Sequence, residues 1–459
     1  MQKLSVLVLV TAMACAPPST TTPPKASGAV PLPDAPAIAA SLANEVGPRL
    51  AGSAGDQAAV AWGLRTMRAL GLSAVHSEPV MVPVWRRISE EASLGGAQLA
   101  VTALGGSPST SDGGMTAEVV VVHSLDEVTA APADAYRGRI VFFDVAIARA
   151  RDGSGYGAGA KIRVLGPAAA SGKGALAVLV RSVGTAGDDA PHMGVTKDPD
   201  APTVAIPSAA LGALSSDRLA RAVAQDKSTK ILLKLRTERL PDATSANVIG
   251  DVRAKGANGG IRGIVLLGAH LDSWDLARGA IDDGCGVGAV LDAAARIARE
   301  GGAKRVVRVV LFAAEENSGA GAKAYAAAHA TELHVSATEM DAGCGAPYEA
   351  RVLAGPSAAT TALTAALAHA IDPLPIAEAP AEGGSDVQPL RLLGVPIIDV
   401  RQDMSLYFDI HHSRRDTPDA IAASDLRLSA SALANVARAV ANFDGALAPI
   451  PDDRRTRSH

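Results

Sequence analysis

The chain has 459 residues, of which 48% are hydrophobic and only 3% aromatic, so it can bury a large core built mainly from aliphatic side chains. Its 43 basic and 47 acidic residues give a net charge of −4, which excludes the polycationic surface typical of nucleic-acid-binding proteins. A chain of this length and composition predicts about two or three globular domains and excludes an intrinsically disordered protein.

The N-terminus predicts an export signal over residues 1–15. Lys3 provides a positive charge, residues 4–10 form an apolar stretch too short to cross a bilayer, and small residues precede Cys15. The run Ala-Met-Ala-Cys resembles a bacterial lipobox, which makes Cys15 the expected lipidation site; an ordinary cleaved signal peptide is the alternative. Residues 16–36, rich in Pro, Thr, Ser and Ala, are expected to form a disordered linker. We therefore expect an exported protein, either a cell-envelope lipoprotein held at the membrane only by its lipid or a secreted protein.

The first half of the chain changes texture near residue 106. Before it, residues 37–71 have helical periodicity and a pair of strands is expected around residues 75–84. After it, short β-rich runs alternate with loops rich in Gly and Asp, which predicts a compact β-rich domain over residues 106–236, inserted between residues 37–105 and 237–448 of the main domain. Its expected strands cover residues 118–122, 139–144, 175–181, 203–206 and 230–235, with a helix over residues 161–171.

From residue 246 onward, strands and helices alternate. This pattern predicts an α/β fold, with a mixed, largely parallel sheet covered by helices. The carboxyl ends of such strands are where ligands gather. Residues 449–459 are expected to form a tail, in which the basic cluster 454–457 is solvated. The expected strands cover residues 262–269, 305–313, 337–340 and 395–400, and the expected helices cover residues 287–299, 322–330, 358–371 and 424–443, the last capped by Ser424.

Candidate metal-binding side chains follow the ends of these strands. His270 offers a neutral imidazole suited to zinc, and Asp272 is placed to accept the hydrogen of the other ring nitrogen. Asp282 can bridge two cations with its two carboxylate oxygens, and Gly284 permits a tight backbone turn beside it. Histidines and carboxylates in this combination suit two zinc ions that share one carboxylate.

Two adjacent carboxylates follow the second of the buried strands. Neighbouring side chains in an extended turn point in opposite directions, so we assign Glu316 as a metal ligand and Glu315 as the general base. Asp341 supplies a further carboxylate. The pair His411 and His412 supplies the second imidazole, and His411 can donate a hydrogen bond to the oxyanion of the reaction.

These motifs resemble those of the di-zinc exopeptidases of metallopeptidase family twenty-eight. The likeness runs from about Val46 to Asp419. The inserted domain resembles a protease-associated domain, which in this family covers or flanks the substrate cleft. The matching segments are residues 46–53, 78–85, 268–284, 315–321, 383–386 and 411–417.

The resemblance implies two metal positions with a shared carboxylate. One zinc ion is bound by His270 and Asp341. The other is bound by Glu316 and His412, and Asp282 lies between the two ions.

The resemblance also selects between the two adjacent histidines. The ligand in the family motif stands four residues before the Asp of an Asp-Thr pair, here Asp416, which selects His412. His411 then holds a position often taken by Tyr, from which the oxyanion contact is expected, and Glu315 is the matching base. Asp272 and Asp416 are expected to support the ligands.

The family acts on small peptides, so the resemblance implies hydrolysis of dipeptides or small peptides with a free amino terminus. A broader aminopeptidase acting on longer peptides is the main alternative, followed by a non-catalytic receptor-like scaffold and a glutaminyl cyclase. Val387 and Gln388 stand where many aminopeptidases of the family have His, which affects the specificity pocket. A small peptide is the expected partner, nucleic acid is not, and a homodimer is compatible with these features.

Cys285 and Cys344 are the cysteines that remain after Cys15. Each lies three residues after a proposed ligand, Asp282 or Asp341, so both are expected near the site. Two buried free thiols are the favoured interpretation, and a disulfide is the alternative.

Overall fold

A computed structural model of the chain describes residues 32–255 and 261–456, and the residues from Pro33 onward form one compact unit. The expected signal peptide, Cys15 and most of the expected linker lie outside the described ranges. Helix α1 begins at Ala35, inside the segment expected as linker. Among the described residues, no helix combines the length and the hydropathy that a membrane span requires.

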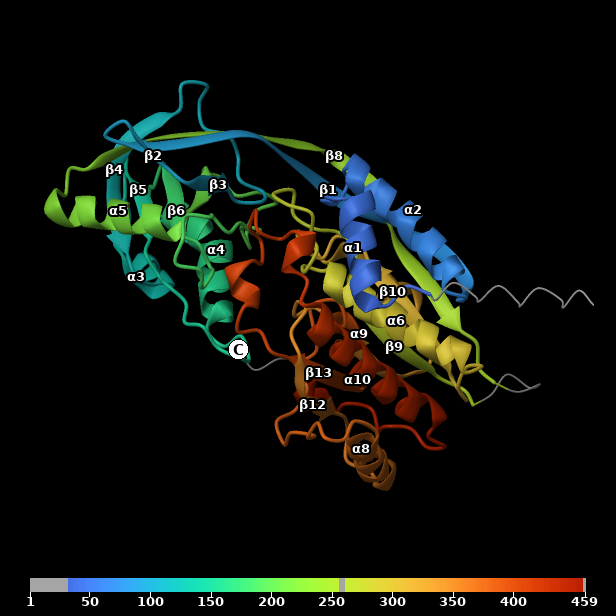
Figure 1. Ribbon diagram of the computed structural model, residues 1–459. Helices are drawn as coiled ribbons and strands as arrows, with labels where there is room; N and C mark the ends of the chain where they lie inside the picture. Colours follow the sequence, from blue (N-terminus) through green and yellow to red (C-terminus); the bar gives the residue numbers. More distant parts are fainter. Residues whose placement is uncertain (1–31, 256–260, 457–459) are drawn as a thin grey trace, which may run out of the picture. The chain divides into compact units, whose positions relative to one another are not determined.

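Two long strands organise the sheet (Figure 1). Strands β1 (Ser73–Leu94) and β8 (Lys230–Val252) pair antiparallel over most of their length. The carboxyl-terminal part of β8 pairs with β10 (Val306–Phe312), and its amino-terminal part pairs with β4 (Met115–Val122). The strand pair expected around residues 75–84 is therefore wrong: this segment is a single strand whose partner lies far along the chain.

The half of the sheet that follows β8 has the expected mixed, largely parallel character. Strand β9 lies parallel to β10 and to β11, and β13 lies parallel to β11. Only the edge strand β12 and the long strand β8 run antiparallel to their neighbours here. Strands β9, β11, β12 and β13 cover Ile264–His270, His334–Glu339, Pro347–Leu353 and Ile397–Gln402.

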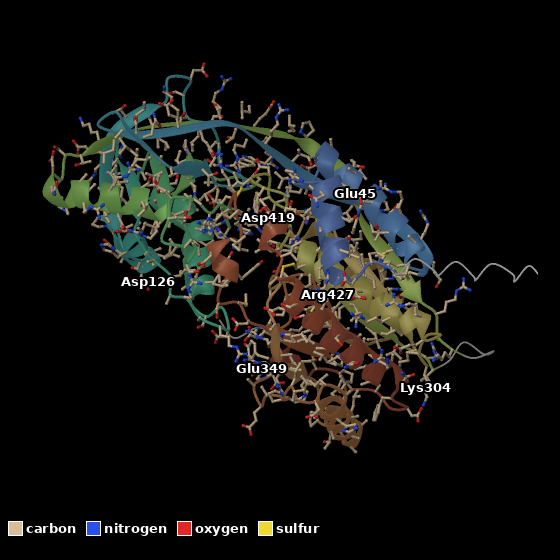
Figure 2. All side chains as sticks on the ribbon, in the orientation of Figure 1. Glu45, Asp126, Lys304, Glu349, Asp419 and Arg427 are labelled. Atoms are coloured by element: carbon tan, nitrogen blue, oxygen red, sulfur yellow. A yellow bond between two sulfur atoms is a disulfide. The ribbon has the colours of Figure 1, made fainter. Side chains whose placement is uncertain are left out.

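Helices cover both faces of this half. Alternate residues of a strand face opposite sides; Leu266 of β9 and Val310 of β10 pack with side chains of α7 and α9. Helix α6 packs on the same two strands and contacts α1 and α10. Charged side chains such as Glu45, Asp126 and Lys304 lie on the outside (Figure 2). The remaining helices are α2 (Ala54–Ala69), α6 (Gly284–Arg299), α7 (Ala320–Ala328), α8 (Ala358–Ala370), α9 (Gln388–Leu392) and α10 (Ala423–Asn442), and α1 ends at Glu45.

Two expectations about helix ends are wrong for local reasons. The helical region over residues 37–71 is interrupted between α1 and α2, because Gly47 takes a left-handed φ of 77° and Pro48 has no backbone N–H to continue a helix. Helix α10 begins before Ser424: Ala422 is its N-cap, and the Ser424 hydroxyl donates to Asp425 instead of capping.

The segment over residues 106–236 contains four parallel strands in the order β4-β5-β6-β7, and β7 pairs with the short strand β3. The strand expected over residues 203–206 is absent, because Pro202 and Pro207 flank it and the strand starts only after Pro207. The helix expected over residues 161–171 begins earlier, at Tyr156. That this segment is a separate, protease-associated domain stays a prediction. Its elements are β2 (Ala97–Leu99), β3 (Val101–Ala103), β5 (Ile140–Phe143), β6 (Ala177–Arg181), β7 (Ser208–Leu211), α3 (Leu125–Ala130), α4 (Tyr156–Ser171) and α5 (Ala213–Gln225).

The C-terminal segment packs against the main domain. Ile450 is fully buried in the core that α7 and α9 share with the sheet, and its N–H donates to the Gly394 carbonyl. The Arg391 guanidinium donates to the carbonyl groups of Arg454 and Thr456. Ile450 is therefore anchored in the core, whereas the side chain of Arg454, in the basic cluster expected to be solvated, is exposed. The boundary of the main domain at residue 448 stays a prediction.

Candidate metal centre

Four parallel strands place the predicted ligands at one edge of the sheet. His270 is the last residue of β9, and Glu316 follows β10 by four residues. Asp341 lies two residues beyond β11, and His412 lies on the loop after β13. Asp282 comes from the loop between β9 and α6. All five predicted ligands thus meet where parallel strands end, as in other open α/β sheets.

The carboxylate of Asp282 lies between two groups of side chains. On one side, its Oδ1 lies 3.2 Å from His270 Nε2, and Asp341 Oδ1 lies 3.9 Å from the same nitrogen. On the other side, its Oδ2 lies 3.2 Å from His412 Nε2, which lies 2.9 Å from Glu316 Oε2. Each half of the expected ligand set is assembled around one oxygen of the shared carboxylate.

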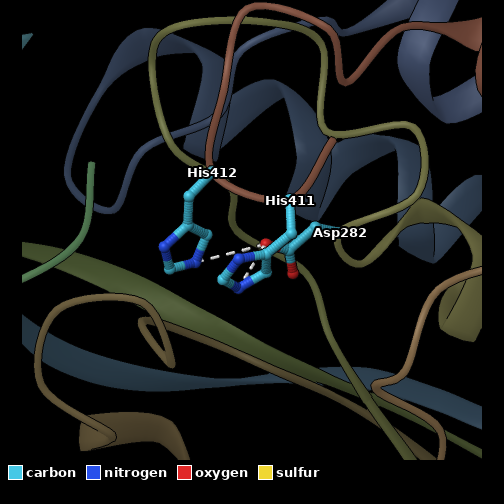
Figure 3. A group of neighbouring side chains, drawn as sticks. All are labelled: Asp282, His411 and His412. Carbon is cyan, nitrogen blue, oxygen red and sulfur yellow. Dashed lines mark ion pairs between the residues drawn. The ribbon is translucent and has the colours of Figure 1, made fainter. Parts of the chain in front are cut away.

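His411 also approaches this carboxylate (Figure 3). Its Nε2 lies 3.6 Å from Asp282 Oδ2, and its ring stacks on that of His412 with centroids 3.5 Å apart. Burial lowers the pKa of His411 to about 3, so the ring is neutral. Of the two rings, that of His412 contacts Glu316, and His412 is therefore the better placed ligand.

The second nitrogen of each ligand imidazole faces a backbone carbonyl. His270 Nδ1 lies 3.1 Å from the carbonyl oxygen of Asp272, and His412 Nδ1 lies 3.1 Å from that of Met193. A neutral ring that donates from Nδ1 carries a lone pair on Nε2. Both Nε2 atoms lie about 3 Å from carboxylate oxygens, an arrangement that requires a proton or a cation between the atoms. Burial opposes the charged form of His270, but its hydrogen bonds to Asp272 and Asp282 raise the pKa of the ring well above its ordinary value.

A divalent cation fits this set of groups. Glu316 Oε1 is buried and has no hydrogen-bond partner within the described residues. Burial and the neighbouring Asp282 raise the pKa of Glu316 well above its ordinary value, and burial raises the pKa of Asp341 to about 7. Crowded carboxylates that resist ionisation are typical of a site whose positive charge comes from a metal. Two imidazoles and three carboxylates are ligands that zinc accepts.

The supporting roles of Asp272 and Asp416 differ in detail from the expectation. The Asp272 carboxylate lies 3.7 Å from His270 Nδ1, farther than its own backbone carbonyl, and accepts the N–H of Glu315 at 3.0 Å. Asp416 accepts three successive N–H groups, those of Ala280, Ile281 and Asp282, at 2.6, 2.7 and 3.2 Å. Asp272 therefore holds the backbone of the predicted general base, and Asp416 fixes the loop of the predicted shared ligand.

Glu315 lies in the turn after β10, directly before the predicted ligand Glu316. Burial raises the pKa of Glu315 above its ordinary value, which brings it closer to the pH at which a general base works well. Its backbone is fixed by the hydrogen bond to Asp272, so the carboxylate is available for proton transfer.

The inserted segment contributes contacts that sequence reasoning missed. Met193 donates its N–H to the His412 carbonyl at 2.9 Å, in addition to accepting from the ring. The buried Arg163 guanidinium holds the Met193 carbonyl from behind at 3.0 Å. The available signal was Arg163 itself, a lone charge between Ile162 and Val164 on a helix with an apolar face.

Two more side chains near the ligands were missed. The Tyr407 hydroxyl lies 3.4 Å from Asp341 Oδ1, and burial raises its pKa well above the ordinary value. Asp386, in the Gly-Gly-Ser-Asp motif, is buried, and neither carboxylate oxygen has a hydrogen-bond partner within the described ranges. The motif was noted for its resemblance, but nothing in the sequence indicated a role for Asp386.

The structure pairs Cys285 and Cys344 in a disulfide, so the favoured interpretation of two free thiols is wrong. The reason is local: Cys285 lies in the first turn of α6 and Cys344 in the loop after β11, and the two loops must meet because they carry Asp282 and Asp341.

Replacing both cysteines with alanine is expected to lower the free energy of unfolding by about 2–4 kcal/mol, because a cross-link across 59 residues restricts the unfolded chain. Denaturant unfolding of the double variant and of the wild type, each with and without reductant, measures this. Equal stability of the oxidised wild type and the variant contradicts the prediction.

Comparison with known proteins gives consistent results. Residues 247–437 match the profile of Peptidase family M28. Carboxypeptidase Q of Mus musculus is 31% identical over 408 residues, which cover 88% of this chain and 84% of the relative. Carboxypeptidase Q of Homo sapiens is 30% identical over 410 residues, with the same coverage of each chain. A crystal structure of a Peptidase M28 precursor from Shewanella amazonensis superposes with a TM-score of 0.86 at 40% identity, over 91% of this chain and 95% of that one. A zinc aminopeptidase from Bacillus subtilis shares the fold, with a TM-score of 0.61 at 20% identity, over 91% of this chain and 100% of that one.

Proposed function

We propose a specific function for this chain, which belongs to peptidase family M28 and is a hydrolytic metallopeptidase. In this proposal it cleaves dipeptides or small peptides with a free amino terminus and uses two zinc ions. The likeness to carboxypeptidase Q that the sequence motifs indicate is confirmed, and with it a metallo-exopeptidase activity. The zinc aminopeptidases among the similar folds agree with the choice of metal.

One observation carries this proposal. The two oxygens of Asp282 face two separate imidazoles, His270 and His412, each 3.2 Å away, and Asp282 belongs to two different groups of side chains that could hold a metal ion. A single cation satisfies only one of these groups. His270 and Asp341 would hold one zinc ion, Glu316 and His412 the other, and Asp282 would be shared.

The residues of the chain divide the remaining chemistry. When bound, the two zinc ions supply Lewis acidity, which lowers the pKa of a water molecule and polarises the scissile carbonyl. Glu315 takes the proton from the attacking water and delivers it to the leaving amine. His411, neutral and close to Asp282, is placed to donate a hydrogen bond to the developing oxyanion.

Removal of metal tests the proposal directly. A chelator is expected to abolish hydrolysis of unblocked dipeptides, and added Zn²⁺ is expected to restore it, with about two zinc ions per chain by elemental analysis. Full turnover by the demetallated protein contradicts the mechanism, and one zinc ion per chain at full activity contradicts the paired site.

A substrate panel separates the alternatives. Unblocked dipeptides, longer peptides and N-acylated peptides are compared at equal concentration. A dipeptidase prefers the first group, a broader aminopeptidase accepts the first two, and cleavage of the acylated peptides contradicts a requirement for a free amino terminus. The receptor-like alternative is disfavoured because every predicted ligand is present.

We also propose that the protein is exported and that Cys15 anchors it through a lipid. The support is the sequence alone: Lys3, the short apolar stretch over residues 4–10 and the small residues before Cys15.

A further inference from the structure

A cavity of about 340 Å³ adjoins the candidate metal centre. Trp274, Asn317 and Ser318 line it, and the last two directly follow the proposed ligand Glu316. Trp274 also lines the narrow pocket that contains Glu316 and His412, and its ring lies edge-on to that of His412 with centroids 5.9 Å apart. Trp274 thus borders both pockets, and the cavity is next to the candidate metal centre.

The cavity is small, and much of its lining is apolar. Its volume is at the lower end of the roughly 300–1,000 Å³ typical of small-molecule sites, which suits one amino-acid residue better than an extended peptide. The main domain and the inserted segment both contribute walls. The apolar side chains that line it include Leu50, Val84, Trp85, Val195 and Val204.

Lys197 brings a positive charge to this cavity. Within the described residues its ammonium group forms no ion pair and no hydrogen bond, and it is accessible to solvent. Burial and the neighbouring Lys323 lower the pKa of Lys197, while Glu315 acts in the opposite direction. Arg239 adds a second cation to the lining, with one nitrogen 3.3 Å from the Pro202 carbonyl oxygen, and Asp198 adds one carboxylate.

The backbone around Lys197 is held in place by hydrogen bonds. The Lys197 N–H donates to the Val164 carbonyl of helix α4 at 3.0 Å. The preceding Thr196 N–H donates to the Gly105 carbonyl at 2.8 Å. A charge on such a fixed backbone loses less freedom when it binds a ligand than one on a free loop does.

A second, smaller pocket adjoins the centre at Asp341. It has a volume of about 70 Å³ and is lined by Glu339, Asp341 and Asp399. Arg401 also lines it but lies 4.0 Å from Glu382. The centre therefore adjoins a small pocket lined by carboxyl groups and a larger, mainly apolar cavity that Lys197 lines, and these different groups suit the two ends of an unblocked dipeptide.

We propose that Lys197 binds the α-carboxylate of a dipeptide whose C-terminal side chain occupies the cavity. An ammonium–carboxylate pair is a strong, charge-assisted contact. This inference rests on the proposed exopeptidase function and narrows its substrate class to peptides that end one residue beyond the cleaved bond. It also makes the inserted segment part of the substrate site.

The test compares a dipeptide with its C-terminal amide, which lacks the charge. Lys197→Met is expected to raise KM for the dipeptide by about 10- to 100-fold and to change hydrolysis of the amide by less than about twofold. Lys197→Arg is expected to recover most of the dipeptide activity. Lys227→Met, an exposed site on the same segment, is the matched control. Equal losses on both substrates, or no loss on either, overturn the proposal.

Calorimetry separates this proposal from the proposed function. Zinc content must be equal in the wild type and in Lys197→Met, which shows that any loss of turnover is not a loss of metal. If the wild type hydrolyses neither substrate, the proposed function fails. The carboxylate site is still supported if the wild type binds the dipeptide more tightly than its amide and Lys197→Met abolishes this difference. Equal binding of the two compounds to the wild type overturns it.

Discussion

Replacing Glu315 with glutamine is expected to lower kcat for dipeptide hydrolysis by about 10²–10⁴-fold, the usual contribution of a positioned proton-transfer group. Bound zinc is expected to stay at about two ions per chain, because Glu315 belongs to neither imidazole–carboxylate group around Asp282. The backbone hydrogen bond of Glu315 to Asp272 does not involve the replaced carboxyl group, so the turn should keep its conformation. Steady-state kinetics and elemental analysis of the same preparation measure both quantities.

Glu316→Gln is the matched comparison, one residue further along the same turn. Its carboxylate lies 2.9 Å from His412 Nε2, so this change is expected to lower zinc content together with kcat. Glu118→Gln, at a partly exposed position on the inserted segment, controls for loss of a negative charge alone. If Glu315→Gln loses metal and Glu316→Gln retains it, the two assignments are reversed.

The buried strands were predictable because their signal is local. Residues 262–269 form a continuous apolar run, and the structure places β9 over Ile264–His270. A polar residue directly after such a strand must lie at the sheet edge, so His270, Glu316 and Asp341 were located by the strands that precede them. The choice of His412 over His411 required the family resemblance, since neither residue differs from the other in local pattern.

The contacts that sequence reasoning missed depend on segments far apart in the chain. The pairing of β1 with β8 joins residues that are 137 to 178 positions apart, from Leu94 with Ile231 to Ser73 with Asp251, and a strand pattern alone does not name its partner. Met193 supports His412 through backbone groups, which any residue type possesses, so no side-chain motif marks it. The pairing of Cys285 with Cys344 likewise follows from the meeting of two ligand loops, which the spacing of the cysteines does not encode.

Adjacent aspartates in the loop after β9 give the second large prediction. Asp282→Asn is expected to reduce bound zinc from about two ions to one or fewer, because both imidazole groups lose their shared carboxylate. Activity is expected to fall by at least about 10³-fold, since the two metals together contribute several kcal/mol to the stabilisation of developing charge. Elemental analysis and kinetics at saturating Zn²⁺ measure the two effects separately.

Asp283→Ala is the control for this change, since the two side chains are neighbours with different partners. The Asp283 carboxylate accepts the N–H of Gly286 at 3.0 Å, as the N-cap of α6, and the N–H of His270 at 3.1 Å. Its loss is expected to lower the free energy of unfolding by about 1–3 kcal/mol and to leave about two zinc ions bound at saturating Zn²⁺.

Retention of both zinc ions by Asp282→Asn would show that the two metals do not share this carboxylate. Loss of both by Asp283→Ala, with stability unchanged, would transfer the bridging role to its neighbour. Because both positions lie on one buried loop, only the combination of zinc content with unfolding free energy separates metal binding from support of the loop.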